Sequence, residues 1–190
     1  MKPFPSKNIL IFLGILLALT ASYWPALFIN YAYHDEYRFW ENLPGAVALH
    51  PFHLDNIIYG RFISSYLLTF AGWFINSVAD LNVLRLVNVL QLSISAVILT
   101  RLLERYFQNN TLHAALAAII IFTLPPFQVM ASVGSDLYLP FTVMLALAAA
   151  GLASTVPPKK SLGKFAIDLR TFSAILCLFC ALSTYASAAM

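Results

Sequence analysis

Long uncharged apolar stretches alternate with short polar connections along the whole chain. Five stretches are long enough, or nearly so, to form a membrane-spanning helix, which needs about 20 mainly apolar residues. They cover residues 8–27, 81–100, 111–131, 137–154 and 171–190. A sixth stretch, residues 62–79, is shorter and contains Gly72, Trp73 and Asn76. The pattern predicts an all-α, polytopic membrane bundle, and the sixth stretch decides its topology.

The composition agrees with a membrane protein and excludes several other classes. Hydrophobic residues make up 61% of the 190 residues and charged residues 10%. A typical soluble domain is about 45–50% apolar and about 25% charged. These values exclude a soluble globular enzyme, a disordered chain and a disulfide scaffold. The net charge is +3, but no dense basic patch contains interleaved aromatics, so we expect a lipid bilayer and no nucleic acid as partner.

The distribution of charge predicts the orientation of the bundle. Lysine and arginine favour the cytoplasmic ends of membrane helices. If residues 62–79 crossed, Arg101, Arg105 and the lysine-rich residues 155–170 would all face outside. If residues 62–79 instead lie in the outer interface, or dip in and return, every basic connection falls inside and most acidic residues fall outside. We therefore expect five crossings, a cytoplasmic N-terminus and an interfacial helix at about residues 62–79.

Local signals refine this layout. Tyrosine and tryptophan in the first outer loop favour the headgroup level, and they predict a second short interfacial helix at about residues 37–42. Pro125 and Pro126 should kink or break the third crossing. The chain reaches Met190 inside an apolar run, so we expect residues 1–190 to be the N-terminal part of one longer membrane domain.

The first candidate for chemistry is the outer-loop segment His34-Asp35-Glu36-Tyr37-Arg38. Adjacent carboxylates near a membrane surface repel each other, so we expect Asp35 and Glu36 to hold a proton, a cation or a sugar hydroxyl between them. Such a carboxylate suits general-base catalysis. A solvated acidic loop is the alternative interpretation.

A second acidic residue, Asp136, follows Gly134 and Ser135 at the outer ends of two predicted crossings. An ionisable residue at membrane depth indicates function. The alternative is a helix cap at the start of the fourth crossing, for which Ser135 and Asp136 are well suited. The predicted topology brings Asp136 to the same side as the acidic pair, so one outward-facing site can contain all three carboxylates.

Three arginines, Arg38, Arg61 and Arg85, fall on the outer side against the general bias. Arginine binds phosphate oxygens in a bidentate manner, so a lipid phosphate at the outer leaflet is the interpretation favoured for Arg61. For Arg85 we favour pairing with an acid such as Asp80, or anchoring to lipid headgroups. Cys177 and Cys180 have apolar neighbours on both sides and are interpreted as small core residues.

Taken together, these motifs resemble the C-type membrane glycosyltransferases that use a lipid-linked donor. In that layout a first span enters an outer loop with an acidic motif and juxtamembrane helices, and a second acidic residue follows on the same face. Asp35-Glu36, residues 62–79 and Asp136 match these features in position. The likeness is greatest to the bacterial type II glucosyl transferases that modify O-antigen. The residues that carry it are Asp35-Glu36, Gly60-Arg61-Phe62 and Ser183-Thr184-Tyr185-Ala186.

The resemblance implies transfer of a hexose, with glucose as the expected sugar, from a polyprenyl-phosphate donor to an extracytoplasmic glycan such as O-antigen. It implies a location in the bacterial inner membrane. Asp35 with Glu36 would act as the base, and Arg61 with Arg38 would bind the donor phosphate. Asp136 and His34 would assist the acceptor or a divalent cation; no other cofactor is implied. The acidic pair is Asp-Glu rather than Asp-Asp, and Ala186 stands where the family has Gln, so the sugar is left open.

The main alternative is a transporter or flippase for a lipid-linked or small solute. Such proteins often have broken helices, and Pro125-Pro126 is consistent with one. They also have charges near the bilayer midplane, whereas here the charges gather at the ends of the predicted spans. A purely structural membrane protein is a further alternative, but it gives no reason for an acidic pair on the outer face.

Overall fold

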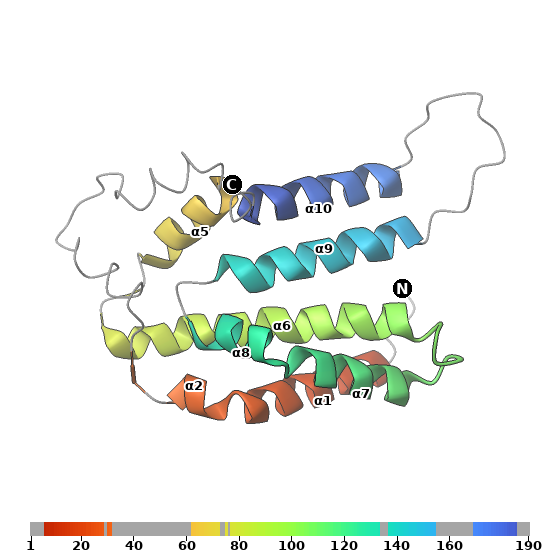
Figure 1. Cartoon of the computed structure of the whole chain (residues 1–190), viewed down its shortest axis with the longest axis horizontal. Coiled ribbons are helices and arrows are strands. Elements are labelled where there is room, and N and C mark those ends of the chain that lie inside the picture. Colours follow the sequence, from red (N-terminus) through yellow and green to blue (C-terminus); the bar gives the residue numbers. More distant parts are fainter. Residues whose placement is uncertain are drawn as a thin grey trace.

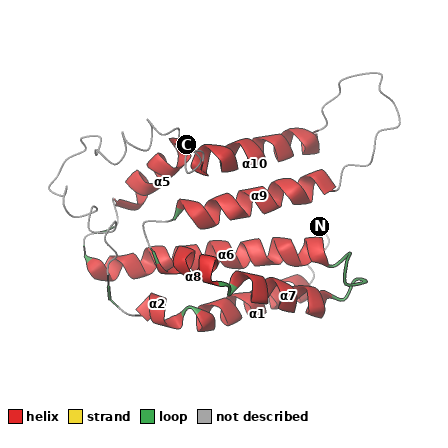
Figure 2. Ribbon diagram, viewed as in Figure 1, coloured by secondary structure: helices red, strands yellow, loops and turns green. Residues whose placement is uncertain are grey.

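A computed structural model describes residues 6–28, 30–31, 62–72, 75, 77–133, 137–154 and 169–185. Within these ranges the regular structure is all helical, without strands, which confirms the predicted all-α class (Figures 1 and 2). The helices are α1 (Ser6–Ser22), α2 (Trp24–Phe28), α5 (Phe62–Gly72), α6 (Leu81–Leu103), α7 (Thr111–Phe122), α8 (Pro125–Ser132), α9 (Tyr138–Ser154) and α10 (Leu169–Tyr185). The helix predicted at residues 37–42 lies outside the described residues.

Helix α6 is the centre of the bundle. It packs against α1, α2, α7, α8 and α9, while α10 packs on the far side of α9 (Figure 1). At one end of the bundle lie α2, the first turn of α6, the last turn of α8 and the first turn of α9 (Figure 1). The start of α1, the end of α6, the start of α7 and the end of α9 lie at the opposite end. Successive long helices therefore run in alternating directions (Figure 1).

The length and apolar composition of the described helices indicate which of them could cross a membrane. Helix α6 together with the 3-10 turn that precedes it, Val78–Leu103, has 26 residues and is long and apolar enough to cross a membrane. Helices α7 and α8 form a bent pair, which is long enough to cross only if the two helices make one span. The remaining apolar helices are shorter, at 10–17 residues. By length and composition alone the described residues contain one spanning helix, or two if the bent pair counts as one span.

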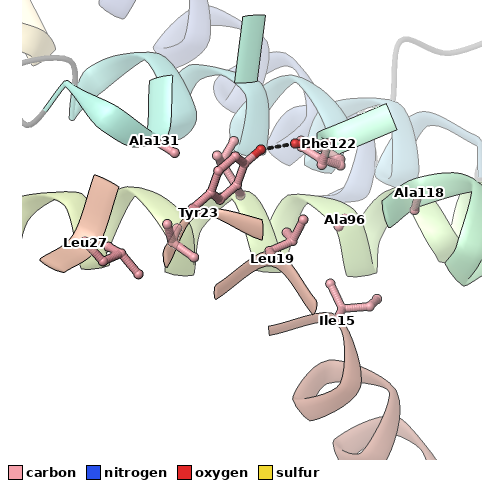
Figure 3. Packing of buried hydrophobic residues seen from close by; sticks show 10 residues of the cluster. Ile15, Leu19, Tyr23, Leu27, Ala96, Ala118, Phe122 and Ala131 are labelled. Atoms are coloured by element: carbon pink, nitrogen blue, oxygen red, sulfur yellow. Dashed lines mark hydrogen bonds between the residues drawn. The ribbon is translucent and has the colours of Figure 1, made fainter. Parts of the chain in front are cut away.

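The main hydrophobic core joins α1 and α2 to α6, α7 and α8 (Figure 3). Ile15, Leu19, Tyr23 and Leu27 are spaced four residues apart, and this spacing gives them one common face along α1 and α2. That face packs against buried residues of the other three helices. These residues are Val89, Leu92 and Ala96 of α6, Ala118 and Phe122 of α7, and Ala131 of α8.

Helices α7 and α8 are separated by a 68° bend at the two prolines. Pro125 and Pro126 have no backbone N–H, so they cannot donate to the carbonyls four residues earlier, those of Ile121 and Phe122. The amide of Leu124 donates to the Ile121 carbonyl at 3.1 Å instead. The hydroxyl of Tyr23 donates to the Phe122 carbonyl (Figure 3). The prediction that the prolines interrupt this segment is confirmed, and a side chain of the α1–α2 junction replaces one missing donor.

Helix α5 covers only part of the sixth apolar stretch. It ends at Gly72, and a separate 3-10 turn, Val78–Asp80, leads into α6. The carboxylate of Asp80 accepts hydrogen bonds from the amide and hydroxyl of Ser77, at 2.7 and 3.0 Å. A helix of 11 residues is about 16 Å long at 1.5 Å per residue, whereas the hydrocarbon core of a bilayer is about 30 Å thick. Helix α5 is therefore too short to cross alone, and it packs against α9 and α10.

Candidate functional site

The residues predicted to carry the chemistry all lie outside the described part of the chain. They are His34, Asp35, Glu36, Arg38, Arg61 and Asp136. The structure describes instead the framework that borders them in sequence. Tyr31 precedes the acidic pair, Phe62 directly follows Arg61, and Val133 precedes Asp136.

Arg85 of α6 is fully buried next to the residues that precede the acidic pair. Its Nη2 donates to the Tyr31 carbonyl at 2.6 Å, and the guanidinium carbon lies 3.9 Å from the centroid of the Tyr31 ring. Its Nη1 is 3.1 Å from Oδ1 of Asn82 and 3.5 Å from the Ala26 carbonyl. The expectation that Arg85 anchors to lipid headgroups is wrong, because the side chain is enclosed by the chain itself. The alternative, pairing with an acid such as Asp80, stays a prediction.

The position of Arg85 has a clear physical basis at the end of α2. The last four carbonyls of a helix have no partner within the helix, and the helix dipole makes this end partially negative. Ala26 lies in the last turn of α2, which ends at Phe28. A buried cation there donates hydrogen bonds to carbonyl oxygens and also interacts favourably with the partial negative charge of the helix end. A flat aromatic ring over the guanidinium adds a cation–π contact.

Asn88, one turn further along α6, does the same for α8. Its Nδ2 donates to the carbonyls of Met130 and Val133, each at 3.0 Å, and its side chain is fully buried. Helix α8 ends at Ser132, so both carbonyls belong to its unsatisfied end. An unpaired carbonyl away from water costs several kcal/mol in a lipid environment. Asn88 therefore fixes the end of α8 on α6.

A direct hydrogen bond links the ends of α2 and α8. The hydroxyl of Tyr31 donates to the carbonyl of Ser132 at 3.1 Å. Beside it, Nδ2 of Asn82 donates to Oδ1 of Asn30 at 2.8 Å. We call this set of contacts the α6 clamp. Its members are Asn82, Arg85 and Asn88 of α6, Ala26, Asn30 and Tyr31 in and after α2, and Met130, Ser132 and Val133 in and after α8.

The α6 clamp brings together residues that precede the two candidate acidic segments in the sequence. Tyr31 is four residues before Asp35, and Ser132 is four residues before Asp136. Sequence reasoning identified the acidic residues but missed the clamp. The signal was present, because Asn82, Arg85 and Asn88 recur every three residues within an otherwise apolar stretch, and this spacing groups side chains along one side of a helix.

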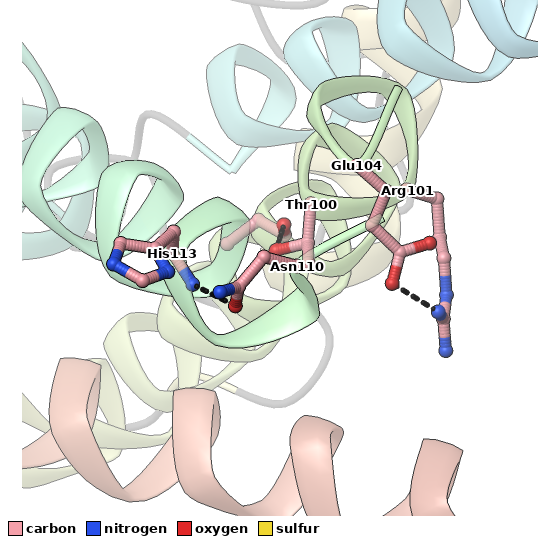
Figure 4. A network of polar contacts seen from close by, with 6 residues as sticks. Thr100, Arg101, Glu104, Asn110 and His113 are labelled. Carbon is pink, nitrogen blue, oxygen red and sulfur yellow. Dashed lines mark hydrogen bonds and ion pairs between the residues drawn. The ribbon is translucent and has the colours of Figure 1, made fainter. Parts of the chain in front are cut away.

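The opposite end of the bundle has a simpler polar structure (Figure 4). Arg101 and Glu104 form an ion pair at 2.7 Å. Oδ1 of Asn110 accepts from the His113 amide at 3.2 Å and caps the start of α7. Gln108 and Asn109 have positive φ angles of 52° and 64° in the tight turn between α6 and α7.

The described residues contain no group of three or more histidine, cysteine or acidic side chains that could hold a metal ion. Cys177 and Cys180 are half-buried residues of α10. Ser183, Thr184 and Tyr185 belong to the last turn of α10 by their backbone, whereas Ala186 lies outside the described residues. Comparison with family models, curated proteins and solved structures finds no match to the chain.

Proposed function

We propose that the chain is a multi-pass protein of the bacterial inner membrane. The support comes from the large apolar side chains that point away from the bundle. Helix α10 exposes Phe172 and Phe179 at 54% and 64%, and α1 exposes Leu17 at 72%. Soluble monomers rarely expose contiguous apolar patches of more than a few hundred Å². Acyl chains would cover these faces without the unfavourable hydration of apolar surface.

The described charges support the orientation proposed for the bundle. Arg101 and Arg105 lie at the end of α6, beside the start of α1, while Asp80 lies at the opposite end. Basic residues favour the cytoplasm, so the N-terminus is cytoplasmic and the α6 clamp faces the extracytoplasmic side. Helix α5 then lies at the outer interface rather than across the membrane.

At this outer end, the activity we propose is that of a glycosyltransferase. It moves a hexose, with glucose as the expected sugar, from a polyprenyl-phosphate donor to an extracytoplasmic glycan such as O-antigen. The observation that supports one site is the hydrogen bond from Tyr31 to Ser132. It joins Tyr31, four residues before Asp35, to Ser132, four residues before Asp136.

The proposed chemistry is a single displacement at the anomeric carbon. Asp35, assisted by Glu36, removes the proton of the acceptor hydroxyl while its oxygen forms a bond to that carbon. The bond between the anomeric carbon and the phosphate oxygen breaks, and polyprenyl phosphate leaves with the electron pair. Arg61 and Arg38 stabilise the charge that develops on this phosphate. The displacement inverts the configuration of the sugar.

Asp136 and His34 complete the proposed site. They orient the acceptor by hydrogen bonds to its hydroxyls, or they hold a divalent cation that does so. A carboxylate and an imidazole are suitable for either role. No nucleotide is needed outside the cytoplasm, because the donor sugar is already activated by its lipid phosphate.

The experiment that tests this proposal compares matched carboxylate variants in proteoliposomes. Radiolabelled polyprenyl-phosphate glucose and a cell-surface glycan are supplied, and label in the glycan is counted for the parent chain, Asp35→Asn and Asp168→Asn. The Asp168 variant is the control, because that residue is assigned to the cytoplasmic side. Loss of transfer in Asp35→Asn alone is expected. Equal transfer in all three chains would remove Asp35 from the role of base.

A transporter or flippase for a lipid-linked or small solute is the second candidate. The 68° bend between α7 and α8 favours it, because broken helices often form the binding sites of transporters. In that case the labelled donor would change sides of the bilayer without any label entering the glycan. A purely structural protein would give neither signal.

A further inference from the structure

The α6 clamp contains a buried cation that has no place among the groups assigned to the reaction. Arg85 is fully buried, so it cannot contact a donor or an acceptor directly. Its partners include two carbonyls, one amide oxygen and one aromatic ring of this chain. A cation enclosed in this way acts on other groups of the protein rather than on a ligand.

Tyr31 is the residue on which these contacts converge. Arg85 binds its carbonyl at 2.6 Å and stacks on its ring, while its hydroxyl binds the Ser132 carbonyl at 3.1 Å. The backbone, the ring and the hydroxyl of Tyr31 are therefore all held, and they are held by two different helices. A residue with three such restraints has little freedom to change its position or its backbone direction.

We propose that Arg85 is a positioning residue, which fixes Tyr31 and thereby the start of the short segment that connects Tyr31 to Asp35 and Glu36 in the sequence. The effect reaches the end of α8 through the Tyr31 hydroxyl. That Arg85 orients the catalytic base rests on the proposed function, whereas its restraint of Tyr31 does not depend on any reaction. It assigns Arg85 to orientation of the base and not to binding of the donor phosphate.

Arginine is required here because lysine cannot reproduce its contacts. The guanidinium is flat, stacks on an aromatic face and donates in several directions from one plane. An ammonium group is a compact charge without a flat face. Arg85→Lys therefore keeps the charge and removes the simultaneous contacts to the Tyr31 ring, the Tyr31 carbonyl and Asn82.

The structural part is tested by distance measurement between spin labels. Cysteines at Phe28 of α2 and Val129 of α8 flank the clamp, and both positions are exposed, at 58% and 56%. Labels at Leu17 of α1 and Leu116 of α7 form a reference pair away from the clamp. The background is Cys177→Ala with Cys180→Ala, and the chain is held in lipid nanodiscs.

We expect Arg85→Lys and Arg85→Gln to broaden the distance distribution between positions 28 and 129 and to leave the reference pair unchanged. Arg101→Gln, at the opposite end of the same helix, is the matched control and should change neither pair. If Arg85 variants do not fold, Tyr31→Phe is used, because it removes only the hydroxyl bond to Ser132. An unchanged distance distribution between positions 28 and 129 in Arg85→Lys and Arg85→Gln would overturn the proposal. If Tyr31→Phe is used in their place, an unchanged distribution in that variant would overturn it.

A kinetic measurement separates positioning from donor binding. In the transfer assay, Arg85→Lys should lower kcat, by up to about 100-fold for a displacement near 1 Å, with the KM for the donor unchanged. A raised donor KM with unchanged kcat would overturn the positioning role. If the distances change as expected but the parent chain transfers no sugar, the clamp stands and the proposed function is what fails.

Discussion

The hydroxyl of Tyr31 donates a 3.1 Å hydrogen bond to the carbonyl of Ser132, a residue 101 positions further along the chain. The bond closes a connection between α2 and α8 that Arg85 and Asn88 of α6 reinforce from the other side. Each contact satisfies a polar group near a helix end that has few partners of its own. The same contacts bring together Tyr31 and Ser132, each four residues before a candidate acidic residue. Contacts that satisfy the helix ends are therefore also those that the proposed site needs.

A first prediction concerns the hydroxyl of Tyr23, which replaces the donor that Pro126 lacks. Tyr23→Phe leaves the buried Phe122 carbonyl without this partner, so we expect the free energy of unfolding to fall by about 1–3 kcal/mol. Denaturation in detergent, followed by circular dichroism, measures the change. Tyr106→Phe is the control, because Tyr106 is 83% exposed and should behave like the parent. A Tyr23 variant as stable as this control would contradict the role assigned to the hydroxyl.

A second prediction concerns Asn88, whose amide holds two carbonyls of the α8 end. Asn88→Leu removes both hydrogen bonds at similar side-chain volume, and we expect stability to fall by about 2 kcal/mol or more. The matched control is Thr142→Val, because the Thr142 hydroxyl bonds only to the Tyr138 carbonyl of its own helix, at 2.8 Å. Equal melting of the two variants would show that Asn88 is not needed to hold α8.

A third prediction concerns the sides of the membrane. In a chain with Cys177 and Cys180 replaced by alanine, Ser77→Cys should react with an impermeant maleimide added to intact spheroplasts. Tyr106→Cys, at the opposite end of α6, should react only after the membrane is opened. The reverse pattern would invert the proposed orientation. Reaction of both cysteines in intact cells would contradict the assignment of α6 as a crossing between them.

A fourth prediction separates the donor from the acceptor. Arg61→Ala removes a cation assigned to the lipid phosphate, so transfer at limiting donor should fall more strongly than transfer at limiting acceptor. Initial rates with each substrate varied in turn provide the comparison. A larger loss at limiting acceptor would move Arg61 to the acceptor side of the site.

The helical pattern could be predicted from the sequence because it depends on local properties. Uncharged apolar stretches indicated the helices, and Pro125-Pro126 indicated a break for a reason that any proline carries with it. The extent of α5 was not predictable in the same way. The apolar composition continues beyond Gly72, and the helix gives way to a 3-10 turn closed by Ser77 and Asp80.

The α6 clamp could not be predicted from the sequence in its details. A buried arginine in an apolar helix looks like a residue for headgroups until its partners are known. Those partners are mainly backbone carbonyls, which every residue has, so no residue type marks them in advance. The acidic pair and Asp136 remain sequence predictions.

We propose that the chain transfers sugar at the outer end of the bundle, and an assay that follows both transfer and transport tests this activity. Purified chain in proteoliposomes receives radiolabelled polyprenyl-phosphate glucose and a glycan acceptor, and label is followed in the glycan and across the bilayer in the same sample. We predict that label enters the glycan with inverted configuration at the anomeric carbon. The amount of label that crosses the bilayer should not exceed that in the protein-free control. Label that crosses the bilayer while the glycan stays unlabelled would contradict the claim and establish a transporter.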